Sequence, residues 1–424
     1  MKNNRKPEIR FLGYTEDWDQ RKLDSIVDRV KSYSLSRDVE TSEYTGYKYI
    51  HYGDIHTKVA DVIDKSSNLP NIKAGNYELL EKGDLVLADA SEDYQGIATP
   101  AVITIDIPYK LVSGLHTIAL RPKQVDPLFL YYLINSQTFR KYGYKTGTGM
   151  KVFGISVTNL LKFEGMFPLL EEQNKIGNFL KQLDDTIALH QQELTTLKQT
   201  KRGFLQKMFP KEGESVPEVR FPGFTGDWEL RKLSEAVNVL DGDRGKNYPS
   251  SGDLLEAGHT LFLSASNVTK NGFSFESNQY ITEEKSSSLR NGKLELNDIV
   301  VTSRGSLGHI AWYNADVQKH IPYVRINSGM LLLRSKEKVN PSFLAQFLKS
   351  PLGKKQIDLI SFGSAQPQLT KKDVSNYKIS IPSFDEQSII GVFFDDVDTL
   401  ITLHQRKLDA LKETKKAFLQ KMFA

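Results

Sequence analysis

Two histidines and an aspartate lie within six residues in the segment His51-Tyr52-Gly53-Asp54-Ile55-His56. Imidazole and carboxylate groups this close together can hold a metal ion or transfer protons. On a strand, however, His51 and Asp54 would point to opposite faces, and no second cluster in the sequence completes a coordination sphere. The segment therefore favours a framework strand and turn, or a polar edge at which His51 and Tyr52 touch phosphates or bases.

Four polar loops carry the other side chains suited to nucleic acid. Base edges are read by Arg, Lys, Asn, Gln, Ser and Thr, while phosphates are held by Lys, Arg and backbone amides. On composition alone each loop is ordinary surface, but the first and the last occupy the same place in the two halves of an internal duplication. The loops span 145–151, 267–271, 303–306 and 361–368, and their candidate DNA-binding residues are Lys145, Thr146, Thr148, Lys151, Asn267, Thr269, Lys270, Arg304, Ser364, Gln366 and Gln368.

The common enzyme motifs are absent from the sequence. There is no phosphate loop, no Gly-x-Gly-x-x-Gly, no His-Glu-x-x-His, no Gly-x-Ser-x-Gly and no Asn-Pro-Pro-Tyr type of methyltransferase motif. Because the chain has no cysteine, thiolate metal sites, iron–sulfur clusters and a cysteine nucleophile are excluded. We therefore expect no catalytic residue, no metal and no cofactor on this chain.

A long helical segment that occurs twice must position these loops. Residues 168–209 and 382–423 agree at 22 of 42 positions, at a constant offset of 214. In both copies apolar residues recur at alternating steps of four and three, the period of a coiled-coil seam. At 1.5 Å per residue, ~38 helical residues span roughly 57 Å.

Neither helix can bury its seam alone. Each could pack on its own globular half, but two copies with matching registers most simply pack on each other as an antiparallel coiled coil. In that arrangement the two histidines of the seam could meet near its centre, and Lys201 and Lys415 would extend their charged ends to solvent. The predicted interface residues are Ile176, Leu183, His190, Leu197 and Phe204 in the first copy, and Ile390, Val397, His404, Leu411 and Phe418 in the second.

The duplication also includes the start of each half. Residues 7–23 return as 217–233 with 11 of 17 positions identical, and Trp18 and Trp228 are expected to be buried anchors. Between these segments and the long helices, strand-like runs alternate with Gly and Asn turns, and a short helix follows that starts on proline. The expected strands lie within 47–55, 83–90, 99–105 and 115–122, and within 259–268, 297–305, 308–314 and 328–335, and the short helices within 127–142 and 341–356.

These elements predict an α+β fold with an internal pseudo-twofold duplication: two globular domains joined by two long helices. The expected limits are a first globular domain at 1–167, a first long helix at 168–210, a second globular domain at 211–381 and a second long helix at 382–424. The halves match at their ends and differ in between, which suggests one framework that holds two different readers.

Composition adds little to this prediction. With 39% hydrophobic and 25% charged residues, the 424-residue chain is typical of a globular protein. No apolar run is long enough to span a bilayer, so we expect no membrane contact and a cytoplasmic location. A net charge of +4 permits an anionic partner without indicating one.

The chain resembles the specificity subunits of type I restriction-modification systems. The resemblance rests on the duplicated architecture and on Pro-x-x-x-Glu-Gln before each long helix, with Pro168, Glu172 and Gln173 in the first copy and Pro382, Glu386 and Gln387 in the second. Further support comes from 49–55, from the strand-like runs at 83–88 and 297–305, and from Gly-x-x-x-Pro-Gln-Leu at 363–369. The first half departs from this last motif at 149–155, where it reads Gly-Met-Lys-Val-Phe-Gly-Ile.

This resemblance implies a non-catalytic reader of double-stranded DNA. Each globular domain would be a target recognition domain for one half of a bipartite sequence, and the coiled coil would determine the gap between the halves. Two modification subunits would dock on the helices and bind S-adenosylmethionine. Restriction subunits that use ATP and Mg would join them.

Two other classes of protein remain as alternatives. A coiled-coil scaffold explains the helices but not two diverged α+β domains, and it predicts no sequence-selective DNA binding. A fused nuclease or methyltransferase needs a carboxylate–lysine or cofactor motif, which the sequence does not contain.

Overall fold

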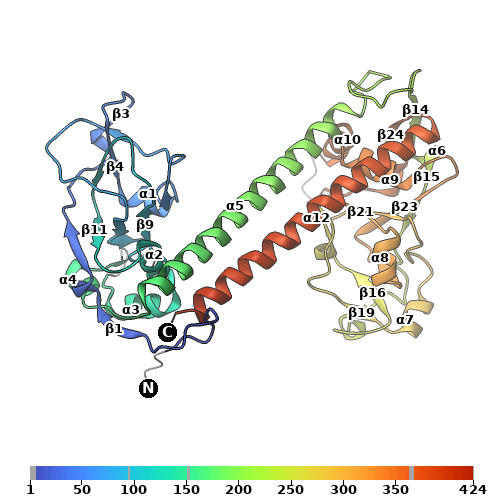
Figure 1. Cartoon of the computed structure of the whole chain (residues 1–424). Helices are drawn as coiled ribbons and strands as arrows, with labels where there is room; N and C mark the ends of the chain where they lie inside the picture. The colour runs from blue at the N-terminus through green and yellow to red at the C-terminus, as the bar shows by residue number, and fades with distance from the viewer. Residues whose placement is uncertain (1–5, 94–95, 150–152, 362–366, 424) are drawn as a thin grey trace. The chain divides into compact units, whose positions relative to one another are not determined.

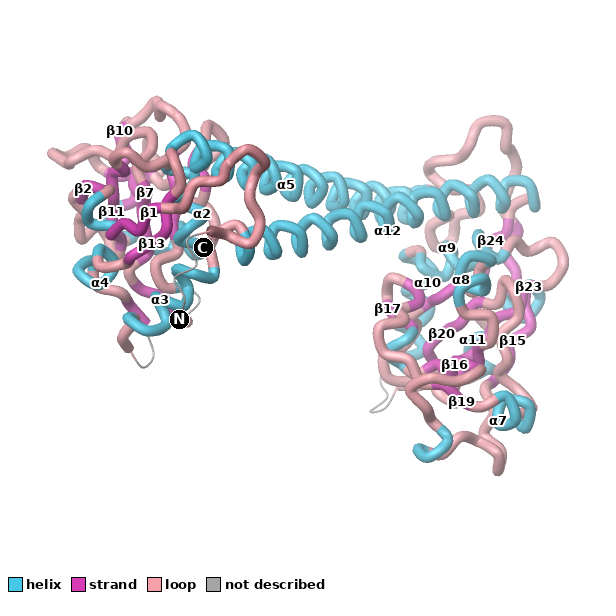
Figure 2. The backbone as a smooth tube through the Cα atoms, turned by 60° about the horizontal axis from the view of Figure 1, so that its bottom comes forward, coloured by secondary structure: helices cyan, strands magenta, loops and turns pink. Residues whose placement is uncertain are grey.

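The computed structural model describes residues 6–93, 96–149, 153–361 and 367–423. The chain divides into two compact units, which are described separately. The first unit comprises Met1–Gln192 with Arg406–Ala424, and the second comprises Glu193–Gln405. Both long helices, α5 (Leu170–Lys207) and α12 (Phe384–Lys421), contribute to both units (Figure 1). Figure 2 shows that the strands of each unit gather in its globular part, to one side of the long helices.

In the first unit a central sheet lies between a layer of helices and a second sheet. Leu85 and Leu87 pack with helix residues such as Phe129, whereas Val86 and Ala88 pack toward the second sheet. Burial on both faces explains why this strand is apolar at every position. The central sheet runs in the order β2 (Val27–Val30), β11 (Thr117–Pro122), β7 (Leu85–Ala88), β9 (Pro100–Ile103), β5 (Val62–Ile63), and the second sheet in the order β10 (Lys110–Ser113), β4 (Tyr47–Ile50), β6 (Asn71–Ile72), β3 (Glu40–Thr41).

Smaller elements complete the first unit. β1 (Asp19–Lys22) pairs with β13 (Glu164–Phe167), the strand that leads into α5, and β8 (Ala90–Ser91) pairs with β12 (Phe153–Gly154). The short helices are η1 (Leu23–Ser25), η2 (Arg37–Val39), α1 (Tyr52–His56), α2 (Pro127–Asn135), α3 (Gln137–Thr146) and α4 (Val157–Leu161).

The second unit repeats this plan. Ile299 and Val301 pack toward the helices, and Val300 packs toward the second sheet. The central sheet runs in the order β15 (Val237–Asp241), β23 (Met330–Ser335), β20 (Ile299–Thr302), β21 (Ile310–Trp312), and the second sheet in the order β19 (Tyr280–Ile281), β16 (Thr260–Leu263), β22 (Val324–Ile326). The pairs are β14 (Glu229–Lys232) with β24 (Lys378–Ile381) and β17 (Val268–Thr269) with β18 (Gly272–Phe273), and the helices are α6 (Leu233–Ala236), η4 (Ser251–Asp253), η5 (Ala265–Asn267), α7 (Glu283–Ser288), α8 (Ala315–His320), α9 (Pro341–Lys349), α10 (Pro351–Ser361) and α11 (Lys371–Ser375).

Two sequence predictions need correction. The short helix expected from Pro127 is two helices, because Ser136 is extended (ψ 162°) and its Oγ donates to the carbonyl of Leu133 at 2.6 Å. The second unit has the same break at Ser350, where a proline follows and disfavours helical backbone in the residue before it. The strand expected over 47–55 ends at Ile50, since a helical turn starts at Tyr52.

The long helices pair antiparallel within each unit, as the sequence predicted. In the first unit the ring of Phe179 on α5 lies 5.0 Å from that of Phe418 on α12, and Lys415 Nζ lies 2.5 Å from Asp184 Oδ1. Residue numbers rise along one helix as they fall along the other, so the helices run in opposite directions.

The second unit contains the duplicated counterparts of these contacts. Phe204 and Phe393 lie 5.1 Å apart between ring centroids, and Lys201 Nζ lies 2.5 Å from Asp398 Oδ1. The expectation that the two seam lysines reach solvent was therefore wrong. Each is half-buried and pairs with an aspartate on the facing helix, because a partly buried charge is stabilised by an opposite charge.

The Pro-x-x-x-Glu-Gln motif fastens the start of each long helix to its domain. The carboxylate of Glu172 accepts hydrogen bonds from both Nε and Nη2 of Arg10, at 2.6 and 2.7 Å. The amide of Gln173 donates to the carbonyl of Pro168 and accepts from the backbone of Asp126. Identical contacts join Arg220 to Glu386, and Gln387 to Pro382 and Asn340. These residues have a structural role that explains why both halves contain them.

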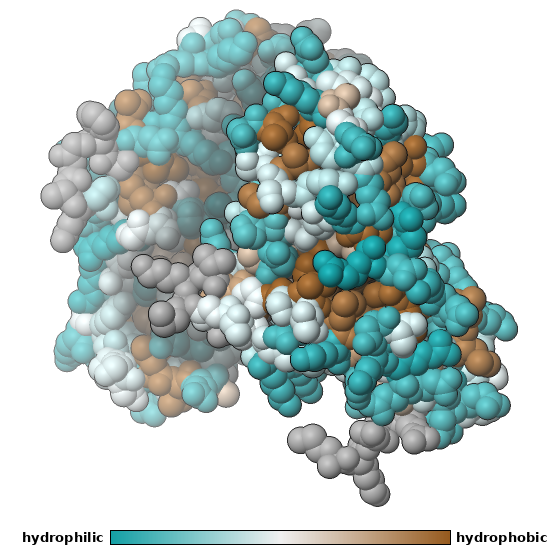
Figure 3. Space-filling view, turned by 90° about the vertical axis from the view of Figure 1, so that its left-hand side faces the viewer, coloured by the Kyte–Doolittle hydropathy of each residue, from teal (hydrophilic) through white to brown (hydrophobic). Residues whose placement is uncertain are grey.

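Trp18 and Trp228 are 1% and 3% exposed, and each packs edge-on against a phenylalanine of the first short helix, Phe129 or Phe343. The anchor role predicted for both tryptophans is confirmed. The face drawn in Figure 3 is largely hydrophilic and carries several apolar patches. Among the described residues no helix combines the length and apolar character needed to cross a membrane.

Candidate nucleic-acid interface

Three chain segments meet at one residue in each unit. In the first unit the backbone N–H of Asp89, directly after β7, donates to the carbonyl of His116 at 3.0 Å, and its carbonyl accepts from Ile155 at 2.9 Å. In the second unit Ser303, directly after β20, makes the same bonds with Gly329 and Leu369. We call this arrangement the three-segment junction. It brings together the end of a central strand, the turn before the strand that lies next to it in the sheet (β11 or β23), and the end of a polar loop.

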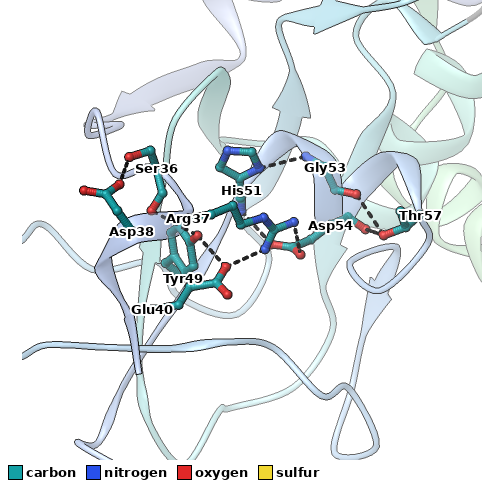
Figure 4. A network of polar contacts seen from close by, with 9 residues as sticks. All are labelled: Ser36, Arg37, Asp38, Glu40, Tyr49, His51, Gly53, Asp54 and Thr57. Carbon is teal, nitrogen blue, oxygen red and sulfur yellow. Dashed lines mark hydrogen bonds and ion pairs between the residues drawn. The ribbon is translucent and has the colours of Figure 1, made fainter. Parts of the chain in front are cut away.

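A capped helical turn lies beside the junction of the first unit. His51 is the N-cap of α1: its Nδ1 accepts from the N–H of Gly53 at 3.1 Å, and its own N–H donates to Asp54 at 2.9 Å (Figure 4). Both side chains are buried, at 7% and 3% exposure. The strand geometry that served as the argument against a metal site therefore does not exist, because reciprocal capping turns this segment into a helix.

Charged neighbours hold the capped turn in place. Arg37 donates to Glu40 at 2.6 Å and to Asp54 at 2.8 Å, and the hydroxyl of the buried Tyr49 donates to Glu40 at 2.7 Å (Figure 4). Burial and the charge of Arg37 lower the pKa of His51 below its usual value. His51 is therefore neutral near pH 7. Because its Nδ1 accepts, its proton is assigned to Nε2, which leaves a hydrogen-bond donor on the other side of the ring.

Three histidines surround Tyr52 at the first residue of α1. The ring of Tyr52 lies 4.5 Å from that of His51, 5.4 Å from that of His116 and 6.0 Å from that of His56. His56 Nε2 lies 2.8 Å from the carbonyl oxygen of Ala90, and His116 Nδ1 lies 3.2 Å from Asp89 Oδ1. These contacts connect the capped turn to the three-segment junction.

Sequence reasoning missed Asp89 and His116. Both were part of segments interpreted only as strands, and nothing in the local pattern marks His116. A polar residue directly after a fully apolar strand, as Asp89 is, would have been the available signal. The pairing itself depends on residues 27 positions apart.

The polar loop of the first unit begins at the end of α3. Lys145 and Thr148 are exposed, whereas Thr146 is half-buried and its hydroxyl donates to the carbonyl of Tyr142. Thr148 and Gly154 exchange backbone hydrogen bonds of 3.0 and 2.8 Å, which leads the chain back to the junction. Lys151 lies outside the described residues.

The second unit has a matching capped turn with different side chains. Ser264 replaces the histidine as N-cap, and its N–H donates to Asn267 at 2.9 Å. The Asn267 amide donates to the carbonyls of Ser274 and Ser277, and the residue is 1% exposed. In the hairpin that follows, the hydroxyl of Thr269 donates to the carbonyl of Gly272, while Lys270 is exposed. Of these three candidates, Lys270 is therefore the most accessible.

Arg304 is the exposed basic group at the second junction. It follows Ser303 directly, and Gly305 after it has a positive φ of 72°, which turns the backbone sharply. Gln368 is half-buried and precedes Leu369, the residue that closes the junction. Ser364 and Gln366 lie outside the described residues. Arg304 and Gln368 are thus held close to one backbone position.

The predicted helix-interface residues lie on α5 or α12 and are buried or half-buried, and their assignment as a subunit interface stays a prediction. His404 Nδ1 lies 3.3 Å from a carboxylate oxygen of Glu193 in the second unit. Ile176, His190 and Ile390 are buried, and Leu183, Leu197, Phe204, Val397, His404, Leu411 and Phe418 are half-buried.

The two junctions offer different hydrogen-bonding groups on similar backbones. The first carries a carboxylate with histidines and a tyrosine, and the second carries an arginine with amide and hydroxyl groups. Carboxylates accept from base amino groups, whereas arginine donates to guanine. Such side chains can read base edges, and the DNA contacts of every candidate residue remain predictions.

Comparison with known proteins finds the same family in both halves of the chain. A family model described as type I restriction modification DNA specificity domain matches twice, at residues 15–199 and 225–413. The MjaVIII type I restriction enzyme specificity subunit of Methanocaldococcus jannaschii is 23% identical over 97% of this chain and 93% of its own. A putative MjaX specificity subunit of the same organism is 24% identical, over 98% and 95%.

Solved structures share the fold. The S subunit of a type I restriction-modification system from M. genitalium aligns with a TM-score of 0.64 at 17% identity, over 99% of both chains. A second solved chain aligns with a TM-score of 0.51 at 17% identity, over 95% of this chain and 96% of the other. It comes from work on the structural basis of complex assembly and conformational transition of the type I R-M system.

Proposed function

The chain belongs to the type I restriction-modification specificity family, and from this premise we propose that its two recognition domains each read one half of a bipartite DNA sequence. The observation that carries the proposal is the three-segment junction. Both units build it from the same backbone hydrogen bonds, yet they place different side chains around it. Two domains that recognise different DNA sequences need a common backbone structure with different side chains at the contact surface, and this duplication provides both.

The two long helices are proposed to determine the gap between the half-sequences. Each helix is 38 residues long, and the antiparallel pairing found in both units is supported by charged and aromatic contacts. A helix advances 1.5 Å per residue and B-DNA 3.4 Å per base pair. One heptad in each helix therefore corresponds to about 10 Å, or about three base pairs.

Catalysis is proposed to belong to partner subunits. Two modification subunits would dock on the long helices and bind S-adenosylmethionine, and restriction subunits would supply ATP- and Mg-dependent cleavage. Support comes from the family membership and from the lack of enzyme motifs in the sequence. The proposed location is the cytoplasm, where the DNA of the cell is accessible.

Methylome sequencing tests the DNA-reading proposal. We expect the chain, co-expressed with its modification subunits, to direct adenine methylation to one bipartite sequence. Deleting one heptad from the middle of both α5 and α12 should shorten the gap by about three base pairs and leave both half-sequences unchanged. A bipartite motif with an unaltered gap would contradict the proposed role of the helices.

Co-purification separates this proposal from a scaffold. The tagged chain should retain a methyltransferase subunit and bind the methylated duplex in preference to a scrambled duplex of equal length. Equal binding of both duplexes would contradict sequence-specific recognition.

A further inference from the structure

The side chains at the first junction form a pair that nothing in the fold requires. His116 Nδ1 lies 3.2 Å from Asp89 Oδ1, and the two side chains are 51% and 32% exposed. The fold already joins these residues through their backbones, since the N–H of Asp89 donates to the carbonyl of His116. The second unit makes that backbone bond with Ser303 and Gly329, which carry no such pair.

His116 also occupies an unusual backbone conformation. Its φ is +53°, in the left-handed region that side chains other than glycine rarely adopt. At the equivalent turn position the second unit has Gly329, whose φ is not positive, so the two turns differ in backbone conformation. A histidine kept where glycine would fit more easily points to a use for its ring. The ring packs edge-on against Tyr52 at 5.4 Å, which fixes the direction of Nδ1 toward the carboxylate.

The carboxylate of Asp89 therefore has one oxygen engaged and one available. Among the described residues, Oδ2 has no hydrogen-bond partner, while Oδ1 faces His116. An ionised carboxylate only accepts hydrogen bonds. On a base pair, the groups that donate in the major groove are the amino groups of cytosine and adenine.

We propose that Asp89, positioned by His116, determines the specificity for one base pair of the first domain's half-sequence by accepting a hydrogen bond from N4 of cytosine. Adenine is disfavoured, because its N7 acceptor lies beside the amino group and repels a carboxylate. This inference rests on the proposed function, and it names the residue and the base class that the first domain uses.

The test compares methylation motifs of variant complexes. The wild-type complex first defines the bipartite motif by methylome sequencing. Asp89→Ala should relax one cytosine position in one half and lower the affinity for the cognate duplex about tenfold to a hundredfold. Asp89→Asn has the same shape but can both donate and accept, so it should shift the preference at that position from cytosine to adenine.

Arg304→Ala is the matched control in the second domain. It should weaken recognition in the other half of the motif and leave the Asp89-dependent position unchanged. If Asp89→Ala and Asp89→Asn both keep the wild-type motif, or if the affected position is not a cytosine, the inference is overturned. A wild-type complex that methylates no bipartite motif would instead overturn the proposed function itself.

Two variants test His116 as a positioning residue. His116→Gly suits the backbone but removes the donor, so discrimination at the cytosine should fall severalfold. His116→Asn tolerates positive φ and can donate to Asp89, so it should restore discrimination. Equal discrimination by the two variants would contradict the positioning role, and thermal unfolding would identify any loss of the fold.

Discussion

The two units share the same buried and paired contacts in their frameworks, and they differ mainly in the polar side chains at the three-segment junction. The buried Arg10–Glu172 pair of the first unit returns as Arg220–Glu386 in the second. The bidentate Arg121–Asp84 pair likewise returns as Arg334–Asp298. At the junction, however, the aspartate and histidine of the first unit correspond to a serine and a glycine in the second. The residues that both units keep hold the fold, whereas the polar side chains at the junction differ between the units.

The seam between the long helices shows a finer version of this difference. Asp184 accepts from the hydroxyl of Tyr132 at 2.8 Å, and its counterpart Asp398 accepts from the amide of Gln346 at 3.1 Å. The lysine that pairs with each aspartate is the same in both units. The charge pair is thus shared, while the short helix that supports it has diverged.

The largest expected effect is on the shared buried pair. Arg10→Met and Arg220→Met should each destabilise their own unit by about 3–5 kcal/mol, because a carboxylate with 0% or 1% exposure loses its partner. Hydrogen exchange resolved by peptide measures the two units separately. Arg21→Met, at a more exposed ion pair, is the control and should change stability by less than about 0.5 kcal/mol. A large effect in only one unit would break the comparison.

A smaller effect is expected at the seam. Lys201→Met and Lys415→Met keep the apolar stem but leave Asp398 or Asp184 without its cation. Because these pairs are only partly buried, the loss should be about 1–2 kcal/mol, between exposed and fully buried pairs. Urea unfolding provides the measurement, with the exposed Lys416→Met as control. Unequal losses would show that Tyr132 and Gln346 support the seam to different extents.

The smallest effect distinguishes the units by pH. Burial and the neighbouring Asp398 raise the pKa of Asp395 to about 6, although Ser342 donates to it at 2.8 Å. The first unit has a lysine, Lys181, at the equivalent position.

A raised pKa means that the protonated form favours folding. The contribution of Asp395 is therefore complete below its unfolded value of about 4 and is lost as the pH rises through about 6. Asp395→Asn should unfold at a higher temperature than the wild type at pH 8 and at a similar temperature at pH 4. The exposed Asp396→Asn is the control. A lower unfolding temperature for Asp395→Asn at pH 8 would mean that the ionised carboxylate stabilises the fold.

Local pattern was enough to predict the duplication, the paired long helices, the apolar central strands and the tryptophan anchors. These features repeat along the chain at fixed spacing, so the sequence displays them directly. It also indicated loops that end at the junctions, among them those of Arg304 and Gln368. The domain limits and the DNA contacts of all candidate residues remain predictions.

Other features required the folded chain, because they join residues that are far apart in sequence. Arg10 and Glu172 are separated by 162 positions, and Asp89 and His116 by 27. The strand-like run at His51 forms a capped helical turn instead, because Asp54 caps the backbone of His51 and Arg37 binds Asp54. A run of residue types restricts which side chains face inward, but which polar groups meet depends on how distant segments close around a core.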